Sequence, residues 1–249
     1  MIIKVFLLFI AGFSYLSIHA QTADEIISKY IENTGGSSNW EKLNGFKYSA
    51  RINTLGLEMP LEVIQLRDGR QMSSAIFQGR EIKQGVFDGN TLWNINVMTM
   101  APETSDLETT ENFKLNINDF PDPFINYRTK GYKVELMGRE TIEGTETFKL
   151  KLSKEPIMID GEKTEDISNY YFDADYFVPI LIESEIKTGP AKGMIQQTRL
   201  SDYQEVSGLY FAFSTEVAVK GQPGNQTITI QSIELNPTID DAIFKMPAK

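Results

Sequence analysis

The sequence contains no cysteine, and its single histidine is His19. Without cysteine the chain has no disulfide, no thiolate nucleophile and no cysteine-ligated zinc site, so its stability must come from packing. If the first twenty residues are removed, the remaining chain has no imidazole either. Ser-His-Asp and Cys-His mechanisms and histidine-ligated metal sites are then excluded. These absences remove most hydrolases at once, so we expect a protein that is not an enzyme.

Positive charge is scarce as well. The chain has 24 Lys and Arg against 34 Asp and Glu, which gives a net charge of −10 at pH 7. The basic residues do not form a cluster, and a phosphate backbone repels an acidic chain. We expect no nucleic-acid partner, and no avid binding to an anionic membrane surface.

A long apolar run occurs only near the N-terminus. Lys4 is the only charged residue before Asp24, and residues 5–18 are almost entirely apolar. This run is shorter than the roughly 18–20 residues that a membrane-spanning helix needs, and it ends at Ala20. The pattern predicts a signal peptide at residues 1–20, cleaved after Ala20 on export to the periplasm. An uncleaved N-terminal anchor is the alternative.

Residues 21–249 read as one domain. Thr22 and Glu25 form a capping box, and apolar residues at helical spacing follow until Gly35-Gly36, which predicts an N-terminal helix. From Phe46 onward the hydrophobic period changes to two, and turn signals such as Asp68-Gly69 recur. This spacing predicts antiparallel hairpins, with about ten or eleven strands.

Residues 99–130 interrupt the alternation. Within them, Asp122 can cap a helix, Pro123 suits the first helical position and Gly131 can end it. We predict a helical insertion that lies as a lid across one face of the sheet.

One face of the predicted sheet is apolar across about ten strands, and so large a sheet tends to curl. The few predicted helices leave two interpretations open: an ordinary packed core, or a pocket for an apolar guest. In the second interpretation the pocket is lined by Trp93, Ile95, Val97, Phe124, Phe148, Leu150, Leu152, Ile180, Ile182, Leu209, Phe211 and Phe213.

Motifs for phosphate binding, nucleophilic serine or zinc hydrolysis are absent from the sequence. Asp173 and Asp175 form the best carboxylate pair, which is typical either of a Ca²⁺ site or acid/base pair, or of a turn capped by aspartate.

Several stretches resemble the LolA-like outer-membrane lipoprotein-sorting proteins, and more closely their Bacteroidetes-type branch: residues 22–36, 130–144, 170–173, 201–209 and 233–247. The resemblance implies a mainly β half-barrel, a single curled antiparallel sheet with an N-terminal helix and a helical lid on its concave face. It implies a periplasmic monomer without cofactor, whose concave face shelters acyl chains. It also implies that Arg51 latches the lid.

The resemblance implies a carrier that takes a lipoprotein or lipid toward the outer membrane, with an inner-membrane exporter and an outer-membrane acceptor as partners. No cysteine follows the apolar run, so the chain resembles the soluble carrier rather than the lipid-anchored acceptor. An envelope sensor or scaffold that binds a protein partner is the alternative, and a hydrolase that uses carboxylates alone is a third possibility.

Overall fold

The computed structural model describes residues 21–247. The predicted signal peptide, residues 1–20, and its cleavage site after Ala20 lie outside this range. Over the described range, no helix combines the length and the apolar character needed to cross a membrane.

Few helices accompany the strands. α1 spans Ala23–Asn33, α2 Ser37–Lys42 and α3 Leu107–Asn116, with short 3₁₀ helices η1 at Ile117–Asp119 and η2 at Asp241–Phe244. The capping box of α1 is confirmed, because Thr22 and Glu25 exchange side chain-to-backbone hydrogen bonds. α2 follows directly.

The strands form one large sheet and one separate hairpin. Their bounds are β1 Gly45–Thr54, β2 Leu57–Leu66, β3 Gln71–Phe77, β4 Arg80–Phe87, β5 Leu92–Ile95, β6 Pro102–Thr104, β7 Lys133–Ile142, β8 Thr145–Ser153, β9 Ile157–Ile159, β10 Glu162–Thr164, β11 Ile167–Asp173, β12 Pro179–Glu185, β13 Ile195–Val206, β14 Leu209–Val219 and β15 Asn225–Leu235.

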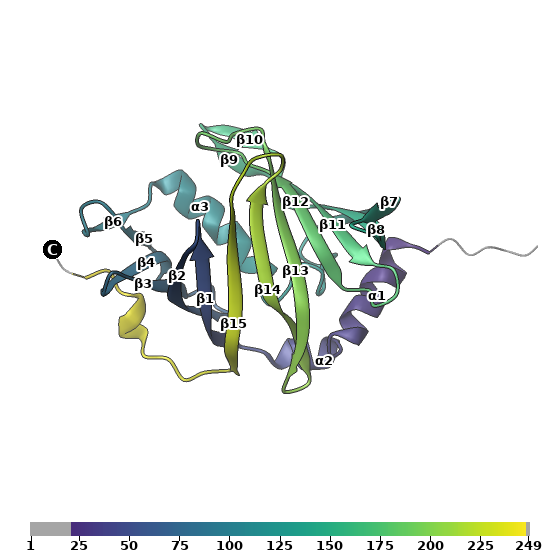
Figure 1. Cartoon of the computed structure of the whole chain (residues 1–249), viewed down its shortest axis with the longest axis horizontal. Helices are drawn as coiled ribbons and strands as arrows, with labels where there is room; N and C mark the ends of the chain where they lie inside the picture. Colours follow the sequence, from purple (N-terminus) through teal and green to yellow (C-terminus); the bar gives the residue numbers. More distant parts are fainter. Residues whose placement is uncertain (1–20, 248–249) are drawn as a thin grey trace, which may run out of the picture.

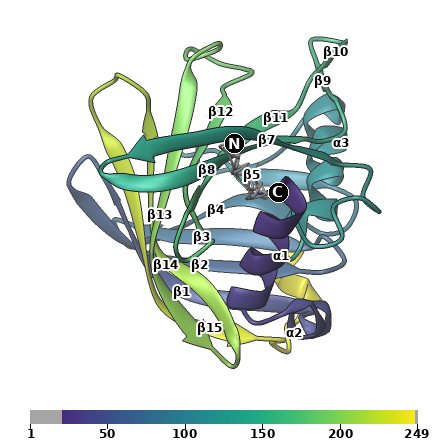
Figure 2. The same ribbon diagram turned by 90° about the vertical axis from the view of Figure 1, so that its right-hand side faces the viewer.

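In the described chain the large sheet has thirteen strands in the order β6-β5-β4-β3-β2-β1-β15-β14-β13-β12-β11-β8-β7, and β9 pairs only with β10. Neighbouring strands are antiparallel, and β1 pairs with the last strand, β15. The sheet curls without closing, and α1, α2 and α3 lie along its concave side (Figures 1 and 2). The predicted curled antiparallel sheet is therefore confirmed, with more strands than expected.

Two clusters of buried side chains hold α1 and α2 on the concave face. The α1 cluster contains Ile26, Ile27, Tyr30, Phe124, Tyr132, Phe148, Leu150, Leu152, Phe172 and Phe177. The α2 cluster contains Trp40, Leu43, Phe120, Ile125 and Leu209, with Phe211 packed against it. Both fill the part of the concavity that lies beneath α1 and α2.

The junction of these helices fits the sheet closely. Gly35 has a φ of +120°, and a methyl group there would lie 2.2 Å from the carbonyl oxygen of Gly208. Only glycine combines this backbone conformation with so close an approach, so α1 and α2 rest directly on the β13–β14 turn.

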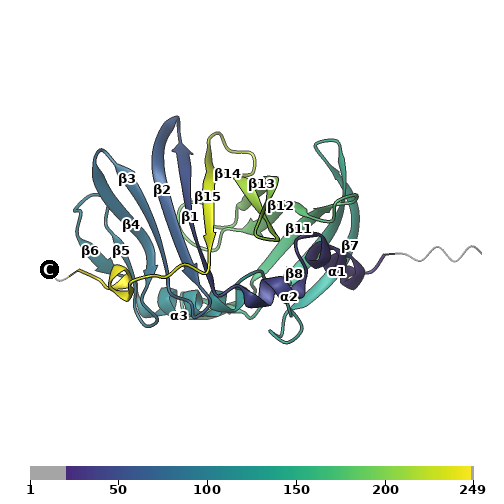
Figure 3. The same cartoon turned by 90° about the horizontal axis from the view of Figure 1, so that it is seen from below.

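A third cluster lies on the opposite, convex face, under the C-terminal segment. It contains Ile64, Met72, Val86, Trp93 and Phe244, and Trp93 Nε1 donates a hydrogen bond to the Phe244 carbonyl at 2.8 Å. Trp93 pairs with Val86, whereas the next pair, Phe87 and Leu92, faces the other way. Phe87 contacts α3, so Trp93 and the η2 segment bonded to it are on the other, convex face. Figure 3 shows the C-terminal segment running from β15 past β1 to its short helix beside β5.

The predicted lid is helical, but not where expected. Residues 122–131 form successive turns rather than a helix, because Asn126 has a φ of 54°, which ends helical geometry. Asp122 still caps the segment, since its carboxylate accepts the amide of Phe124 at 2.8 Å. The helix of this insertion is α3, which begins after the N-cap Asp106.

Candidate functional site

The helix α3 covers the part of the concave face that α1 and α2 leave open. It is a polar helix: Thr110 is its only buried residue, and Leu107 is 75% exposed. It therefore cannot be held by an apolar face in the way that α1 is held.

Polar contacts to the β9–β10 hairpin hold α3 instead. The Asn112 side chain donates to the Met158 carbonyl at 2.6 Å and accepts the Met158 amide at 2.8 Å. One turn earlier, the Glu108 carboxylate accepts the amides of Asp160 and Gly161 at 2.9 and 2.8 Å. These four bonds make a latch between α3 and the hairpin, which stands directly above the helix in Figure 2.

Two apolar contacts join α3 and η1 to the sheet. The rings of Phe113 and Phe87 have centroids 4.9 Å apart. Ile117 packs on Gly69 in the β2–β3 turn, where a methyl group would lie 2.4 Å from the Ile117 Cδ1 atom. The attachment of α3 to the sheet is thus small, and it depends on a glycine.

A pocket of about 470 Å³ lies between α3, β9 and strands β11 and β12. Five of its sixteen lining residues are apolar, namely Leu92, Phe113, Ile157, Ile159 and Ile167, and the other eleven are polar or charged, among them Asn116, Lys154 and Asp166. We call this the α3 pocket. Its volume lies within the roughly 300–1,000 Å³ that is typical of small-molecule sites, and its lining suits an amphiphile.

The polar end of the α3 pocket is an ion-pair cluster around Lys154. Lys154 Nζ lies 2.9 Å from Asp119 Oδ2, 3.0 Å from Asp166 Oδ2 and 3.2 Å from Asn116 Oδ1. Burial alone would lower the pKa of Lys154, but the two carboxylates outweigh it and hold that pKa above its usual value. The ammonium is therefore charged and its three donors are occupied.

A second buried carboxylate lies nearby. Asp122 accepts a hydrogen bond from the Tyr30 hydroxyl of α1 at 2.8 Å. Burial raises the pKa of Asp122 above its usual value, although the hydrogen bonds from Phe124 and Tyr30 oppose the change. This carboxylate ties α1 to the 120–131 segment.

Two tyrosine hydroxyls on the concave face have no hydrogen-bond partner among residues 21–247: those of Tyr48 and Tyr170. Yet in the described structure every fully enclosed side-chain polar atom has a partner. Both hydroxyls therefore reach solvent, although burial raises the pKa of Tyr48 to about 12.

Half-buried apolar side chains surround these hydroxyls on the central strands. Strand alternation and the cross-strand register place the following residues on the same face as Tyr48 and Tyr170: Ile52, Val63, Val217, Ile182, Leu200, Ile228 and Ile230. The concave face thus offers a partly exposed apolar lining next to the α3 pocket.

The structure divides the predicted lining residues into groups. Phe124, Phe148, Leu150 and Leu152 are buried in the α1 cluster, and Leu209 and Phe211 belong to the α2 cluster. Phe213 is also buried, and Ile182 lies on the partly open concave face. Most of these side chains support the helices rather than line an open space.

The remaining predicted lining residues lie elsewhere. Trp93 and Ile95 belong to the convex cluster, and Val97 follows the end of β5 and is 59% exposed. Ile180 lines a separate pocket together with Arg199 and Glu216. A period of two identifies residues that share a face, but not which face is concave, so these four positions were wrongly assigned to the cavity.

The lid arginine also differs from the expectation. Arg51 Nη1 pairs with Glu58 Oε1 at 3.1 Å on the exposed side of the β1–β2 hairpin, and no hydrogen bond joins it to α3 in the described structure. Arg67 is the arginine that binds carbonyls: its guanidinium donates to Trp40, Glu41 and Leu43 at the end of α2. It fixes α2 rather than the lid.

Asp173 forms the capped turn. Its carboxylate accepts the amides of Asp175 and Tyr176 at 2.8 and 2.9 Å. Over residues 21–247 the structure brings together no group of three or more acidic side chains, histidines or cysteines that could hold a metal ion.

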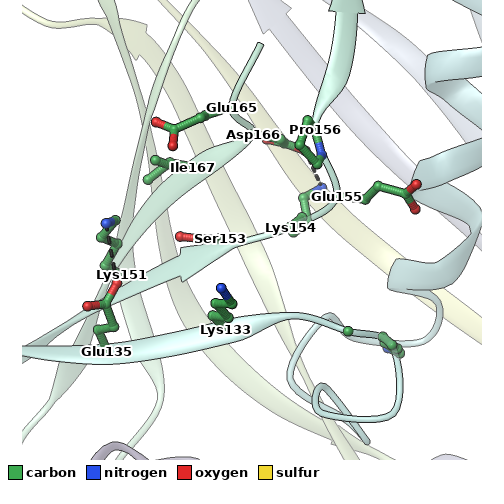
Figure 4. A pocket seen from close by; sticks show the side chains of 12 residues that line it. Lys133, Glu135, Lys151, Ser153, Lys154, Glu155, Pro156, Glu165, Asp166 and Ile167 are labelled. Carbon is green, nitrogen blue, oxygen red and sulfur yellow. Dashed lines mark ion pairs between the residues drawn. The ribbon is translucent and has the colours of Figure 1, made fainter. Parts of the chain in front are cut away.

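A second pocket, of about 570 Å³, adjoins the α3 pocket and has a charged lining (Figure 4). Lys151 pairs with Glu135 at 3.3 Å, and Lys154 and Asp166 line this pocket as well as the α3 pocket. The Lys154–Asp166 pair therefore stands between the two spaces. We call the second space the outer pocket.

Solved structures share this architecture. A DUF1329 family protein from Desulfovibrio piger superposes with a TM-score of 0.55 at 13% identity, covering 91% of this chain and 98% of the other. An outer membrane lipoprotein-sorting protein domain from Vibrio parahaemolyticus gives 0.54 at 9%, covering 88% and 94%. A LolA superfamily protein from Nitrosomonas europaea gives 0.53 at 14%, covering 91% and 98%.

The chain has a LolA-like fold. No protein-family model matches the sequence, and no curated protein sequence matches it. At these identities the LolA-like similarity concerns the fold alone.

Sequence reasoning missed the residues that form the α3 pocket: Phe113, Ile157, Ile159 and Ile167. One signal was present, because Ile157 and Ile159 alternate with Met158 just before the Asp160-Gly161 turn, which is typical of a short hairpin with one apolar face. The partner of that hairpin, α3, has too weak a hydrophobic pattern to be recognised locally.

Proposed function

We propose that the protein is a periplasmic carrier that shelters the acyl chains of a lipoprotein or lipid beneath α3 and delivers them toward the outer membrane. The observation that supports this most is the α3 pocket, a cavity of about 470 Å³ with five apolar lining residues and a polar end, under a helix attached mainly by polar bonds. We propose binding rather than catalysis as its role.

A carrier must release what it binds. Two acyl chains of about 15 methylenes each, at roughly 0.8 kcal/mol per buried methylene, would gain about 24 kcal/mol. That exceeds the roughly 18–21 kcal/mol ceiling for noncovalent affinity. Part of this gain must therefore be offset, either by incomplete burial or by opening of the lid. Because α3 is joined to the hairpin by four hydrogen bonds, it suits the second solution.

A scaffold that binds a protein partner is less well supported. Its most accessible docking edge would be β7, the last strand of the sheet. That strand exposes four charged side chains and has a register shift between Leu136 and Gly138, which are features that protect edges against pairing, although Met137 at the shift is 55% exposed.

The test is binding of a fluorescent acyl ester, which we expect with micromolar affinity. Phe113→Asp and Ile159→Asp place charge in the apolar wall and should each weaken binding at least tenfold with little loss of stability, because both side chains are only half-buried. Leu107→Asp, on the exposed side of α3, is the matched control. Equal binding by all four proteins would contradict the proposal, and lipid mass spectrometry of the natively purified protein gives an independent answer.

A further inference from the structure

The cations of the α3 pocket are already occupied. Two ammonium groups line it. Lys154 lies between Asp119 and Asp166, and Lys187 Nζ lies 3.0 Å from Glu185 Oε2. A ligand that carries a negative charge would therefore have to compete with a carboxylate of the protein for each ammonium.

The acidic groups outnumber these cations. Glu108, Asp166 and Glu185 line the pocket, and Asp119 lies directly behind Lys154. With both lysines charged, the four carboxylates leave an excess of two negative charges around the space. The Glu185 side chain is 47% exposed, so solvent and salt weaken its share of this excess, and the less exposed Asp119 and Asp166 act most strongly on a head group near Lys154.

Around Lys154 the unoccupied polar atom is an acceptor rather than a donor, whereas the hydroxyls of Ser168, Ser184 and Thr188 line other parts of the pocket. Asp166 Oδ2 accepts from Lys154, and no hydrogen bond occupies its Oδ1 in the described structure. The Lys154 donors are taken by Asn116, Asp119 and Asp166. A head group that supplies hydroxyl or ammonium hydrogens fits this arrangement, whereas a carboxylate does not.

We infer that the α3 pocket selects amphiphiles whose head group donates hydrogen bonds and carries no negative charge, and that it discriminates against free fatty-acid carboxylates. This inference rests on the proposed carrier function and names the chemical class of its cargo. It assigns the selection to Asp166 beside Lys154 and to the more exposed Glu185 beside Lys187, while the apolar lining residues bind the tail of either ligand.

The first experiment compares two ligands with the same acyl chain, a monoacylglycerol and the free fatty acid, at pH 8 and low ionic strength. Each is titrated by displacement of the fluorescent acyl ester. We expect the monoacylglycerol to bind at least tenfold more tightly. Equal affinities would overturn the inference and leave the carrier function intact, whereas failure of both ligands and of the ester would overturn both.

Two substitutions locate the selectivity. Glu185→Gln leaves Lys187 without its carboxylate on a side chain that is partly in solvent, so folding should be unaffected. It should tighten fatty-acid binding about threefold at low salt and leave monoacylglycerol binding unchanged. Asp166→Asn should reduce the difference in affinity between the two ligands further, because it removes a carboxylate that pairs with Lys154.

Glu32→Gln on the exposed side of α1 is the matched control, since it changes the net charge equally but lies outside the α3 pocket. The control should keep the wild-type ratio of affinities. If Glu185→Gln and Glu32→Gln give the same ratio of monoacylglycerol affinity to fatty-acid affinity, local selection by the pocket is wrong.

Discussion

The two long helices on the concave face are held by different means. α1 buries Ile26, Ile27 and Tyr30 against aromatic and leucine side chains of β8 and β11. α3 buries only Thr110 and is joined to its neighbours by the Asn112 and Glu108 latch, by a hydrogen bond from Lys154 to Asn116 and by the ring contact of Phe113. One helix completes the core, and the other covers a space that the core leaves open.

This difference shows where the fold is able to open. Regions with few buried apolar contacts unfold locally at a fraction of the global free energy. α3 and the β9–β10 hairpin meet that description, whereas α1 does not. Opening on the α3 side would expose the α3 pocket without disturbing the aromatic cluster under α1.

The largest expected effect is on the α1 side. Leu150 is fully buried in the α1 cluster, so Leu150→Ala should lower the free energy of unfolding by about 2–5 kcal/mol through the cavity it leaves. Urea denaturation measures this. Acyl-ester affinity of the protein that stays folded should be unchanged, and a comparable loss of affinity would mean that the two sides are coupled.

A smaller effect comes from Asp122, which joins α1 to the 120–131 segment. Because its folded-state pKa is raised, its ionisation disfavours the folded state. Its contribution is most favourable below the unfolded pKa near 3.8 and is lost as pH rises through the folded pKa.

Asp122→Asn should remove this dependence, so the stability of the variant relative to wild type should increase as pH rises through that window. Chemical denaturation at a series of pH values follows the difference. A flat difference across the window would show that burial of Asp122 has no energetic consequence.

On the α3 side we expect a change in the rate of ligand release rather than in the global free energy of unfolding. Asn112→Ala removes both bonds to Met158 and should lower the global free energy of unfolding by less than about 1 kcal/mol, because α3 opens locally. Release of the acyl ester should be about tenfold faster in stopped-flow fluorescence. Glu111→Ala, which breaks only the α3 ion pair with Lys114, is the control and should leave the rate unchanged.

The smallest effect should come from Arg51. Its ion pair with Glu58 is exposed, and pairs of this kind contribute roughly 0–1 kcal/mol. Arg51→Ala should leave stability and the release rate nearly unchanged. Faster release in this variant would restore the lid-latch role that the sequence resemblance implies.

Local signals predicted the parts of the fold that depend on local interactions. The Thr22–Glu25 capping box and the alternation in β1 and β8 are where the pattern placed them. The assignment of Trp93 failed because alternation cannot distinguish two faces that are both covered, one by α3 and the other by Phe244.

The lid was misplaced for a related reason. Helix α3 is stabilised by the backbone of Met158, which is 46 residues away in sequence, so its own residues give a weak signal. The 122–131 segment shows the reverse case, because its capping residue and apolar content resemble a helix while Asn126 adopts a left-handed conformation. The α3 pocket lies between such long-range contacts, and for that reason no local pattern could locate it.

The positions of the two tryptophans have an optical consequence. Trp40 packs on Phe211 in the α2 cluster, and Trp93 is enclosed between the sheet and the C-terminal segment; neither lines the α3 pocket. The intrinsic tryptophan fluorescence should therefore change when the protein unfolds and should not change when a ligand binds in the α3 pocket. The variant Phe113→Trp should report ligand binding by its fluorescence, because Phe113 lines the α3 pocket and the indole would contact the bound ligand.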